Sequence, residues 1–146
     1  MNLPYKILGA PGSPYSRKLR SILRYRRIPF IWANRNSKED NNTPKVAVNL
    51  LPVLVIPDEN GKYSEAKIDT TPIIRSLERL HSARSVIPID PVISFLDYLI
   101  EDYADEWLTK AMFHFRWAHQ KNVNFAESVL PRWTMNHLSD EEIKPL

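Results

Sequence analysis

The stretch Ser13–Ser16 (Ser-Pro-Tyr-Ser) constrains the fold of this chain more than any other part of it. It follows a short apolar segment, Lys6–Leu8, and a hinge between Gly9 and Gly12, and it opens a segment rich in arginine. Serine is a preferred helix N-cap and proline a preferred first helical residue, because the missing N–H of proline has no intrahelical partner there. The pattern therefore predicts a strand, a turn and a helix that begins with a hydroxyl group. Such a helix end suits the binding of an anion, because it offers unpaired N–H groups and a partial positive charge.

The composition limits the classes of protein to which the chain can belong. It has 146 residues, of which 43% are hydrophobic, so it can form a core that fills one domain and part of another. It has no cysteine, which excludes disulfides, thiolate metal sites and a cysteine nucleophile. No apolar run approaches the roughly 20 residues of a membrane span, and residues 1–4 lack the features of a signal peptide. We therefore expect a cytoplasmic protein that does not bind membranes.

Strand and helix signals alternate over residues 1–81. The apolar runs predict strands at Tyr5–Leu8, Ile28–Trp32, Leu51–Ile56 and Lys62–Ser64. Capping residues predict helices from Ser13 to Arg27 and from Asp69 to His81. The polar segment between the second and third strands is expected to be a loop with one helical turn near Val46–Asn49.

The pattern changes after a linker at residues 82–91, which contains Pro88 and Pro91. Apolar residues then recur at steps of three and four, which predicts a long amphipathic helix from Val92 to about His119. A further helix is expected to begin at Asn122 or Asn124 and to end before Pro131.

Taken in order, the Ser13–Ser16 turn, the strand that opens at Leu51-Pro52 and the Asp69-Thr70 helix cap resemble the glutathione transferase family. The resemblance implies an α/β thioredoxin-like N-terminal domain (βαβαββα, with a mixed four-stranded sheet) over residues 1–81. It implies a partial all-helical C-terminal domain over residues 92–146. Glutathione would then be the co-substrate, a small electrophile its reaction partner, and a homodimer the assembly.

The resemblance also assigns roles to individual residues. Ser13 occupies the position at which serine-type members keep the hydroxyl that hydrogen-bonds the glutathione sulfur. Pro52 corresponds to a cis-proline, and the backbone of Leu51 would pair with the cysteinyl unit of the tripeptide. Asp69 and Thr70 match the acid-hydroxyl pair that holds the γ-glutamyl end.

Physical chemistry supports Ser13 as a stabiliser of a thiolate and not as a nucleophile. A free thiol has a pKa near 8.5, so little of it is ionised at neutral pH. Lowering that pKa by about two units requires roughly 2.7 kcal/mol of preferential thiolate binding, which a hydroxyl donor at a helix end can supply. Ser16 is an alternative donor, and Arg17 and Arg20 could add positive potential. Plain helix capping is the competing interpretation of both Ser13 and the Asp69-Thr70 pair.

Three other functions compete with glutathione conjugation. The chain could be a non-catalytic module that keeps the fold for dimerisation or partner docking. The arginines between Arg17 and Arg27 could bind nucleic acid, but few aromatic residues accompany them, so we expect no nucleic-acid partner. Glu101, Asp105, His114 and His119 could be imagined as metal ligands, yet a solvated acidic face explains these carboxylates better and no metal is expected.

Overall fold

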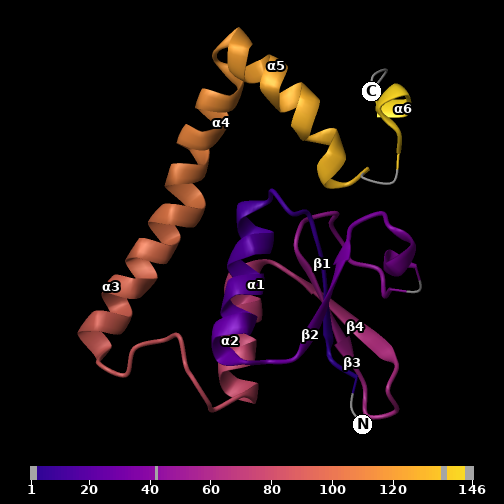
Figure 1. The fold of residues 1–146 in the computed structure, drawn as a ribbon. Coiled ribbons are helices and arrows are strands. Elements are labelled where there is room, and N and C mark those ends of the chain that lie inside the picture. The colour runs from indigo at the N-terminus through magenta and orange to yellow at the C-terminus, as the bar shows by residue number, and fades with distance from the viewer. Residues whose placement is uncertain (1–2, 42, 136–137, 144–146) are drawn as a thin grey trace.

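In the computed structural model, which describes residues 3–41, 43–135 and 138–143, a mixed four-stranded sheet carries two helices on one face (Figure 1). The strands, in the sheet order β2-β1-β3-β4, are β2 (Phe30–Asn34), β1 (Tyr5–Gly9), β3 (Val53–Pro57) and β4 (Tyr63–Ile68). Strand β1 pairs parallel to β2 and antiparallel to β3, and β3 pairs antiparallel to β4. Helix α1 (Pro14–Arg26) joins the two parallel strands, and α2 (Thr70–Leu80) follows β4. The thioredoxin-like fold expected from the sequence is confirmed.

The core lies on both faces of this sheet because side chains of a strand alternate between its faces. The cluster beneath the two helices contains Ile7, Leu19, Leu23, Ile28, Leu54, Ile73 and Leu77. The cluster on the opposite face contains Leu8, Ala33, Val53 and Val55. Val46 packs on this second cluster from the loop that follows β2. Helices α1 and α2 are therefore held against the sheet by apolar packing.

The loop between β2 and β3 differs from the sequence prediction. No helix is present at Val46–Asn49, and the helical turn is instead a 3-10 segment, η1 (Lys38–Asp40). The carboxylate of Asp40 explains the difference, because it accepts hydrogen bonds from the backbone N–H of Asn36 at 3.0 Å and from the Thr43 hydroxyl at 3.0 Å. These local bonds hold the turn before Thr43.

The hairpin between β3 and β4 turns at the Asp-Glu-Asn-Gly segment, residues 58–61. Gly61 has φ of 73°, a left-handed conformation that glycine adopts without steric cost. The carboxylate of Asp58 accepts from the backbone N–H groups of Asn60 and Lys62, both at 2.9 Å. Strand β4 extends beyond the predicted Lys62–Ser64 because its pairing with β3 continues to Ile68 opposite Val53.

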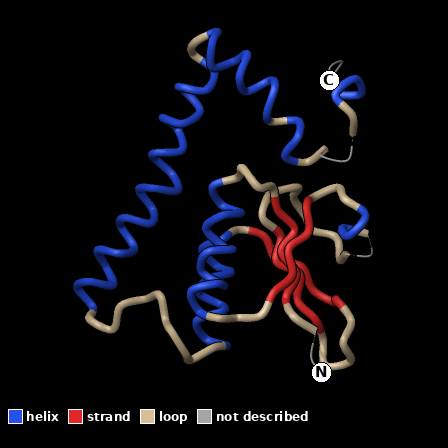
Figure 2. Tube along the Cα trace, in the orientation of Figure 1, coloured by secondary structure: helices blue, strands red, loops and turns tan. Residues whose placement is uncertain are grey.

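The helical part begins at Asp90, whose carboxylate caps the next helix by accepting from two backbone N–H groups. Figures 1 and 2 show one long helical rod that stands beside α1, followed by a sharp turn and a helix that runs back toward the α/β part. The rod comprises α3 (Pro91–Asp102), the π-helical segment η2 (Tyr103–Leu108) and α4 (Thr109–Trp117). It is followed by α5 (Gln120–Val129), the 3-10 turn η3 (Pro131–Trp133) and the short α6 (Asp140–Ile143). The sequence predicted the rod and α5, but not the π-helical turn.

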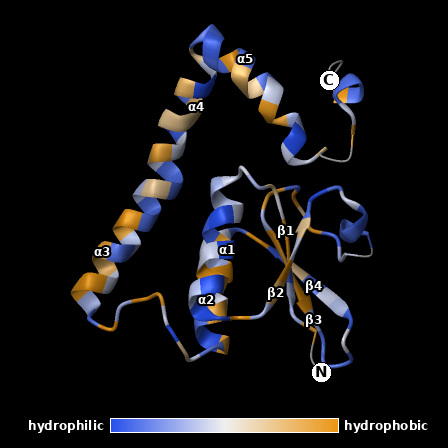
Figure 3. Cartoon of the chain, viewed as in Figure 1, coloured by the Kyte–Doolittle hydropathy of each residue, from blue (hydrophilic) through white to orange (hydrophobic). Residues whose placement is uncertain are grey.

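The rod exposes many apolar side chains. None of the residues of α3, η2 or α4 is buried, and Figure 3 shows hydrophobic and hydrophilic residues alternating along it. Ile89, in the segment before α3, is fully exposed at 100%. No helix in the described part of the chain is both long and apolar enough to cross a membrane.

A buried arginine, Arg26, binds the segment that connects the α/β part to the helical part. The side chain of Arg26, at the end of α1, is 0% exposed, and its Nη1 forms an ion pair with Oε1 of Glu78 on α2 at 2.9 Å. Its Nη2 donates to the backbone carbonyls of His81 and Ala83. Glu78 also accepts from the backbone N–H of Val86 at 3.1 Å. The connecting segment is thus held to α1 and α2 by side chains of opposite charge.

Candidate functional site

A cavity of about 290 Å³ opens where the beginnings of α1 and α2 meet the loop before β3 and the π-helical segment of the rod. Its lining residues are Tyr15, Leu50, Leu51, Asp69, Thr70, Thr71, Asp105 and Glu106. Three residues that the sequence singled out, Leu51, Asp69 and Thr70, therefore come together in one place although 18 positions separate Leu51 from Asp69.

The peptide bond between Leu51 and Pro52 is cis, as the sequence predicted. Pro52 is fully buried immediately before β3, and it does not line the cavity itself. Leu51 lies at the cavity wall at the point where the chain enters the sheet.

Asp69 caps α2 in an unusual conformation. Its φ of 71° and ψ of 117° lie outside the regions that non-glycine residues normally occupy. Its carboxylate accepts from the backbone N–H of Thr71 at 3.2 Å, and the neighbouring Thr70 is only 3% exposed. Backbone strain of this kind persists where the surrounding structure enforces it, often at a ligand site. The cap thus presents Asp69 and Thr70 to the same cavity.

Ser13 caps α1 but does not line the cavity. It is 8% exposed, and its Oγ accepts from the backbone N–H of Ser16 at 3.3 Å. The side chain of Trp133 covers the neighbouring turn so closely that a Cβ atom at Gly12 would lie 2.1 Å from its Cε2. Ser16 is fully buried, and its hydroxyl accepts from the backbone N–H of Ala10 at 3.3 Å. The hydroxyls of both serines therefore accept backbone hydrogen bonds at the N-terminus of α1. At this helix end, the residue that lines the cavity is Tyr15.

The two arginines considered as sources of positive potential lie away from the cavity. Arg17 is exposed, and the guanidinium of Arg20 lies over the ring of Trp32, 5.1 Å from its centre. Neither residue lines the cavity. The cation that contacts the residues of the site is Lys18, which the sequence analysis did not select.

Lys18 joins α1 to the rod. Its Nζ donates to Oε1 of Glu101 at 2.7 Å and also to Oδ2 of Asp105. The Tyr15 hydroxyl donates to the backbone carbonyl of Asp105 at 2.7 Å, inside the π-helical segment. The expectation that Glu101 and Asp105 form a solvated acidic face is therefore wrong, since their side chains are only 26% and 19% exposed and both pair with Lys18. Within the described residues, no group of histidine and carboxylate side chains is arranged to hold a metal ion.

This ion triad shifts the pKa of two of its members. Burial alone raises the pKa of Glu101, but hydrogen bonds from Lys18 and Thr71, together with the Lys18 charge, outweigh it and hold the pKa below its ordinary value. Burial lowers the pKa of Lys18, but the hydrogen bonds and charges of Asp105 and Glu101 outweigh that effect and raise it.

We expect the stability of the protein to depend on pH through this triad. The contribution of Glu101 should be complete above the unfolded-state pKa of glutamate, about 4.3, and should be lost as pH falls through the lower pKa of the folded state. The contribution of Lys18 should be complete below about pH 10.4 and lost as pH rises through its higher folded-state pKa. Urea unfolding at a series of pH values measures the free energy of unfolding and so detects both the loss at low pH and the loss at high pH. Glu101→Gln should weaken the acid dependence, whereas Glu127→Gln, at an exposed position on α5, should leave it unchanged.

Comparison with known proteins decides the family. Residues 7–85 match the family model of the glutathione S-transferase N-terminal domain, which covers more than half of the chain. This chain belongs to the glutathione S-transferase family. No curated protein matches it significantly.

Two solved glutathione S-transferases illustrate the relationship. One, from Methylobacterium radiotolerans, was crystallised with glutathione sulfonate; it shares 27% identity over 64% of this chain and 42% of its own, with a TM-score of 0.51. The other, a Tau class enzyme from mango (Mangifera indica), is 19% identical over 84% of this chain and 56% of its own, with a TM-score of 0.58, and shows likeness of fold alone. The chain thus spans about half the length of these glutathione S-transferases.

Proposed function

We propose that this chain binds glutathione in the cavity between α1, α2 and the rod, and stabilises its thiolate for conjugation to a small electrophile. The observation that carries the proposal is the convergence of Leu51, Asp69 and Thr70 on one cavity, next to a cis Leu51-Pro52 bond. The backbone of Leu51 would hold the cysteinyl unit, and Asp69 and Thr70 would hold the γ-glutamyl end. In this proposal residues 1–81 form the glutathione-binding domain, residues 82–91 the linker and residues 92–146 a partial helical domain.

The thiolate would lie at the N-terminus of α1. Oγ of Ser13 already accepts from the backbone N–H of Ser16, so the hydroxyl proton remains to be donated. A sulfur anion placed there would receive this charge-assisted hydrogen bond together with the positive end of the helix dipole. Both effects favour the ionised thiol, which is the nucleophile that attacks the electrophile.

An apolar cavity of about 330 Å³ between α4 and α5 is the candidate binding site for the electrophile. It is lined by Met112, Phe115, Arg116, Asn122, Phe125, Ala126, Val129, Leu130 and Trp133. Trp133 connects this cavity to the α1 N-terminus because its side chain also covers Gly12. An apolar electrophile in this cavity would therefore lie near the proposed position of the sulfur.

A homodimer is part of the same proposal. The rod leaves large apolar side chains such as Phe95 and Tyr98 about half exposed, at 58% and 45%. Arg79 on α2 and Asp97 on α3 are exposed as well, and both line a cavity of about 530 Å³ between these helices. Packing the α/β part of one subunit against the rod of another would cover apolar surface and bring opposite charges together. Sedimentation equilibrium measures the assembly, and a monomer at micromolar concentration would contradict this part.

Calorimetric titration of the full chain with glutathione tests the proposed binding. We expect Thr70→Val to weaken glutathione binding by about tenfold or more, because a hydrogen bond to a charged group contributes about 1.5–3 kcal/mol. Ser128→Ala, which removes an exposed hydroxyl on α5 away from the cavity lining, is the control. Absence of glutathione binding by the folded wild-type chain would contradict the proposed function.

The second candidate function is a non-catalytic module that keeps the thioredoxin-like fold for dimerisation or partner docking. The burial of Ser13 at 8% exposure and the close cover of Gly12 by Trp133 favour it, because both restrict access to the α1 N-terminus. In that case glutathione affinity would be the same in wild type and Ser13→Ala, and no conjugation would be detected with either protein.

A further inference from the structure

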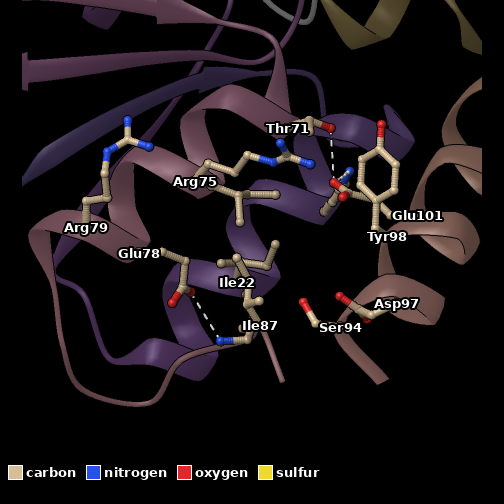
Figure 4. A pocket seen from close by; sticks show the side chains of 13 residues that line it. Ile22, Thr71, Arg75, Glu78, Arg79, Ile87, Ser94, Asp97, Tyr98 and Glu101 are labelled. Atoms are coloured by element: carbon tan, nitrogen blue, oxygen red, sulfur yellow. Dashed lines mark hydrogen bonds and ion pairs between the residues drawn. The ribbon is translucent and has the colours of Figure 1, made fainter. Parts of the chain in front are cut away.

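A series of polar contacts runs beside the cavity and joins its two helix ends. The Thr71 hydroxyl, in the first turn of α2, donates to Oε1 of Glu101 at 3.0 Å, and Figure 4 shows this bond. The same oxygen accepts from Lys18 at 2.7 Å, and Lys18 also donates to Asp105. The backbone carbonyl of Asp105 accepts from the Tyr15 hydroxyl at 2.7 Å. These contacts connect the start of α2 to the start of α1 through the rod.

The contacts lie between two cavities. Figure 4 looks into the second of them, about 530 Å³ in volume, and labels Thr71 and Glu101 among its lining residues; Lys18 lines the same cavity. Thr71 also lines the proposed glutathione cavity, together with Tyr15 and Asp105. The contact series therefore forms part of the wall of the glutathione cavity, and its geometry sets the position of that wall.

Lys18 is the member that makes the series stable. It places one positive charge between two carboxylates, and the three side chains are only 20%, 26% and 19% exposed, so water screens them weakly. Without Lys18, the carboxylates of Glu101 and Asp105 would lie close together with reduced solvation. Asp105 lines the cavity, so its uncompensated charge would also oppose an anionic ligand.

We propose, on the basis of the proposed function, that Lys18 is a positioning residue of the glutathione site. By holding Glu101 and Asp105 it fixes Thr71 and Tyr15, the neighbours of Thr70 on α2 and of the Ser13 cap on α1. It also neutralises one of the two negative charges next to the place where glutathione, with its two carboxylates and its thiolate, would lie. Lys18 acts through these residues and does not itself line the cavity.

The test compares Lys18→Met with Lys18→Arg in the full chain. Calorimetric titration gives the glutathione affinity, and the ultraviolet absorbance of the bound thiolate as a function of pH gives the pKa of the bound thiol. We expect Lys18→Met to weaken glutathione binding by about tenfold and to raise the pKa of the bound thiol, because two unpaired carboxylates disfavour anions. Lys18→Arg keeps the positive charge and should restore both quantities to near wild-type values.

Two further variants separate electrostatics from loss of structure. Adding Glu101→Gln to Lys18→Met removes one unpaired charge while leaving an oxygen that can accept from Thr71, and should recover part of the affinity. Arg24→Met, at an exposed position on the same helix, should change neither quantity. If Lys18→Met does not fold, Thr71→Val carries the test, with an expected loss of affinity of about threefold.

The outcomes distinguish the two proposals. A wild-type chain that folds but binds no glutathione contradicts the proposed function itself. A wild-type chain that binds glutathione, while Lys18→Met or Thr71→Val binds it equally well with the same thiol pKa, overturns only the role of Lys18. Failure of Lys18→Arg to restore the affinity also overturns that role.

Discussion

Replacing Ser13 with alanine should reduce kcat for glutathione conjugation by about 100-fold or more, because removal of one preorganised donor to a developing or bound anion has an effect of this size. The pKa of the bound thiol should rise in the same variant, since the thiolate would lose its charge-assisted hydrogen bond. Stopped-flow measurement of thiolate absorbance and steady-state kinetics with an aromatic electrophile measure the two effects separately.

Ser13 is also the N-cap of α1, so its loss has a structural effect that needs its own control. Losing the cap should lower the free energy of unfolding by about 1 kcal/mol, which leaves the protein folded if it has ordinary stability. Ser13→Thr retains both the cap and the donor and should retain activity, whereas Ser16→Ala removes a neighbouring hydroxyl that accepts from the backbone N–H of Ala10. Equal kcat and equal thiol pKa in wild type and Ser13→Ala would show that the hydroxyl only caps the helix.

Replacing Arg26 with alanine should lower the free energy of unfolding by about 3–5 kcal/mol, the range observed when one partner of a buried ion pair is removed. The guanidinium is 0% exposed and forms the ion pair with Glu78, and its Nη2 also donates to the carbonyls of His81 and Ala83. Its removal leaves a carboxylate and two carbonyl groups without these partners. Urea unfolding followed by circular dichroism measures the effect.

Two variants check the cause of that loss. Arg24→Ala, two positions earlier and exposed, should change the free energy of unfolding by less than about 0.5 kcal/mol. The double variant Arg26→Met/Glu78→Leu replaces both charges by apolar groups and should recover much of the stability. A loss in Arg26→Ala no larger than that in Arg24→Ala would mean that the buried pair does not hold the connecting segment in solution.

The features that were predictable from the sequence are those with local causes. Ser13 and Asp69 cap helices through bonds to backbone groups within a few residues, so short motifs indicate where α1 and α2 begin. Alternating faces of the strands and the Asn-Gly turn likewise depend on neighbouring residues. The cis bond before Pro52 was predictable only through resemblance to a family, because most such bonds are trans.

The features that were missed depend on contacts between distant residues. Lys18 acquires its importance from Glu101 and Asp105, which lie more than 80 positions away. A signal for this pairing did exist, because Arg17–Arg27 carries only basic charged residues and residues 97–106 carry only acidic ones. The turn at Lys38–Asp40 was misplaced because the carboxylate of Asp40, and not helix propensity, decides where the loop turns.

The fully exposed Ile89 is a suitable position for a probe in the segment between the α/β part and the helical part. Because the chain has no cysteine of its own, Ile89→Cys would create a single thiol for attachment of a fluorescent dye. A dye at this position would lie between the residues that Arg26 binds, His81 and Ala83, and the first turn of α3. A change in the angle between the rod and the α/β part would alter the backbone of this segment. Its fluorescence would report in solution whether a ligand changes the connection between the two parts, and Ile89 lines none of the three cavities described above.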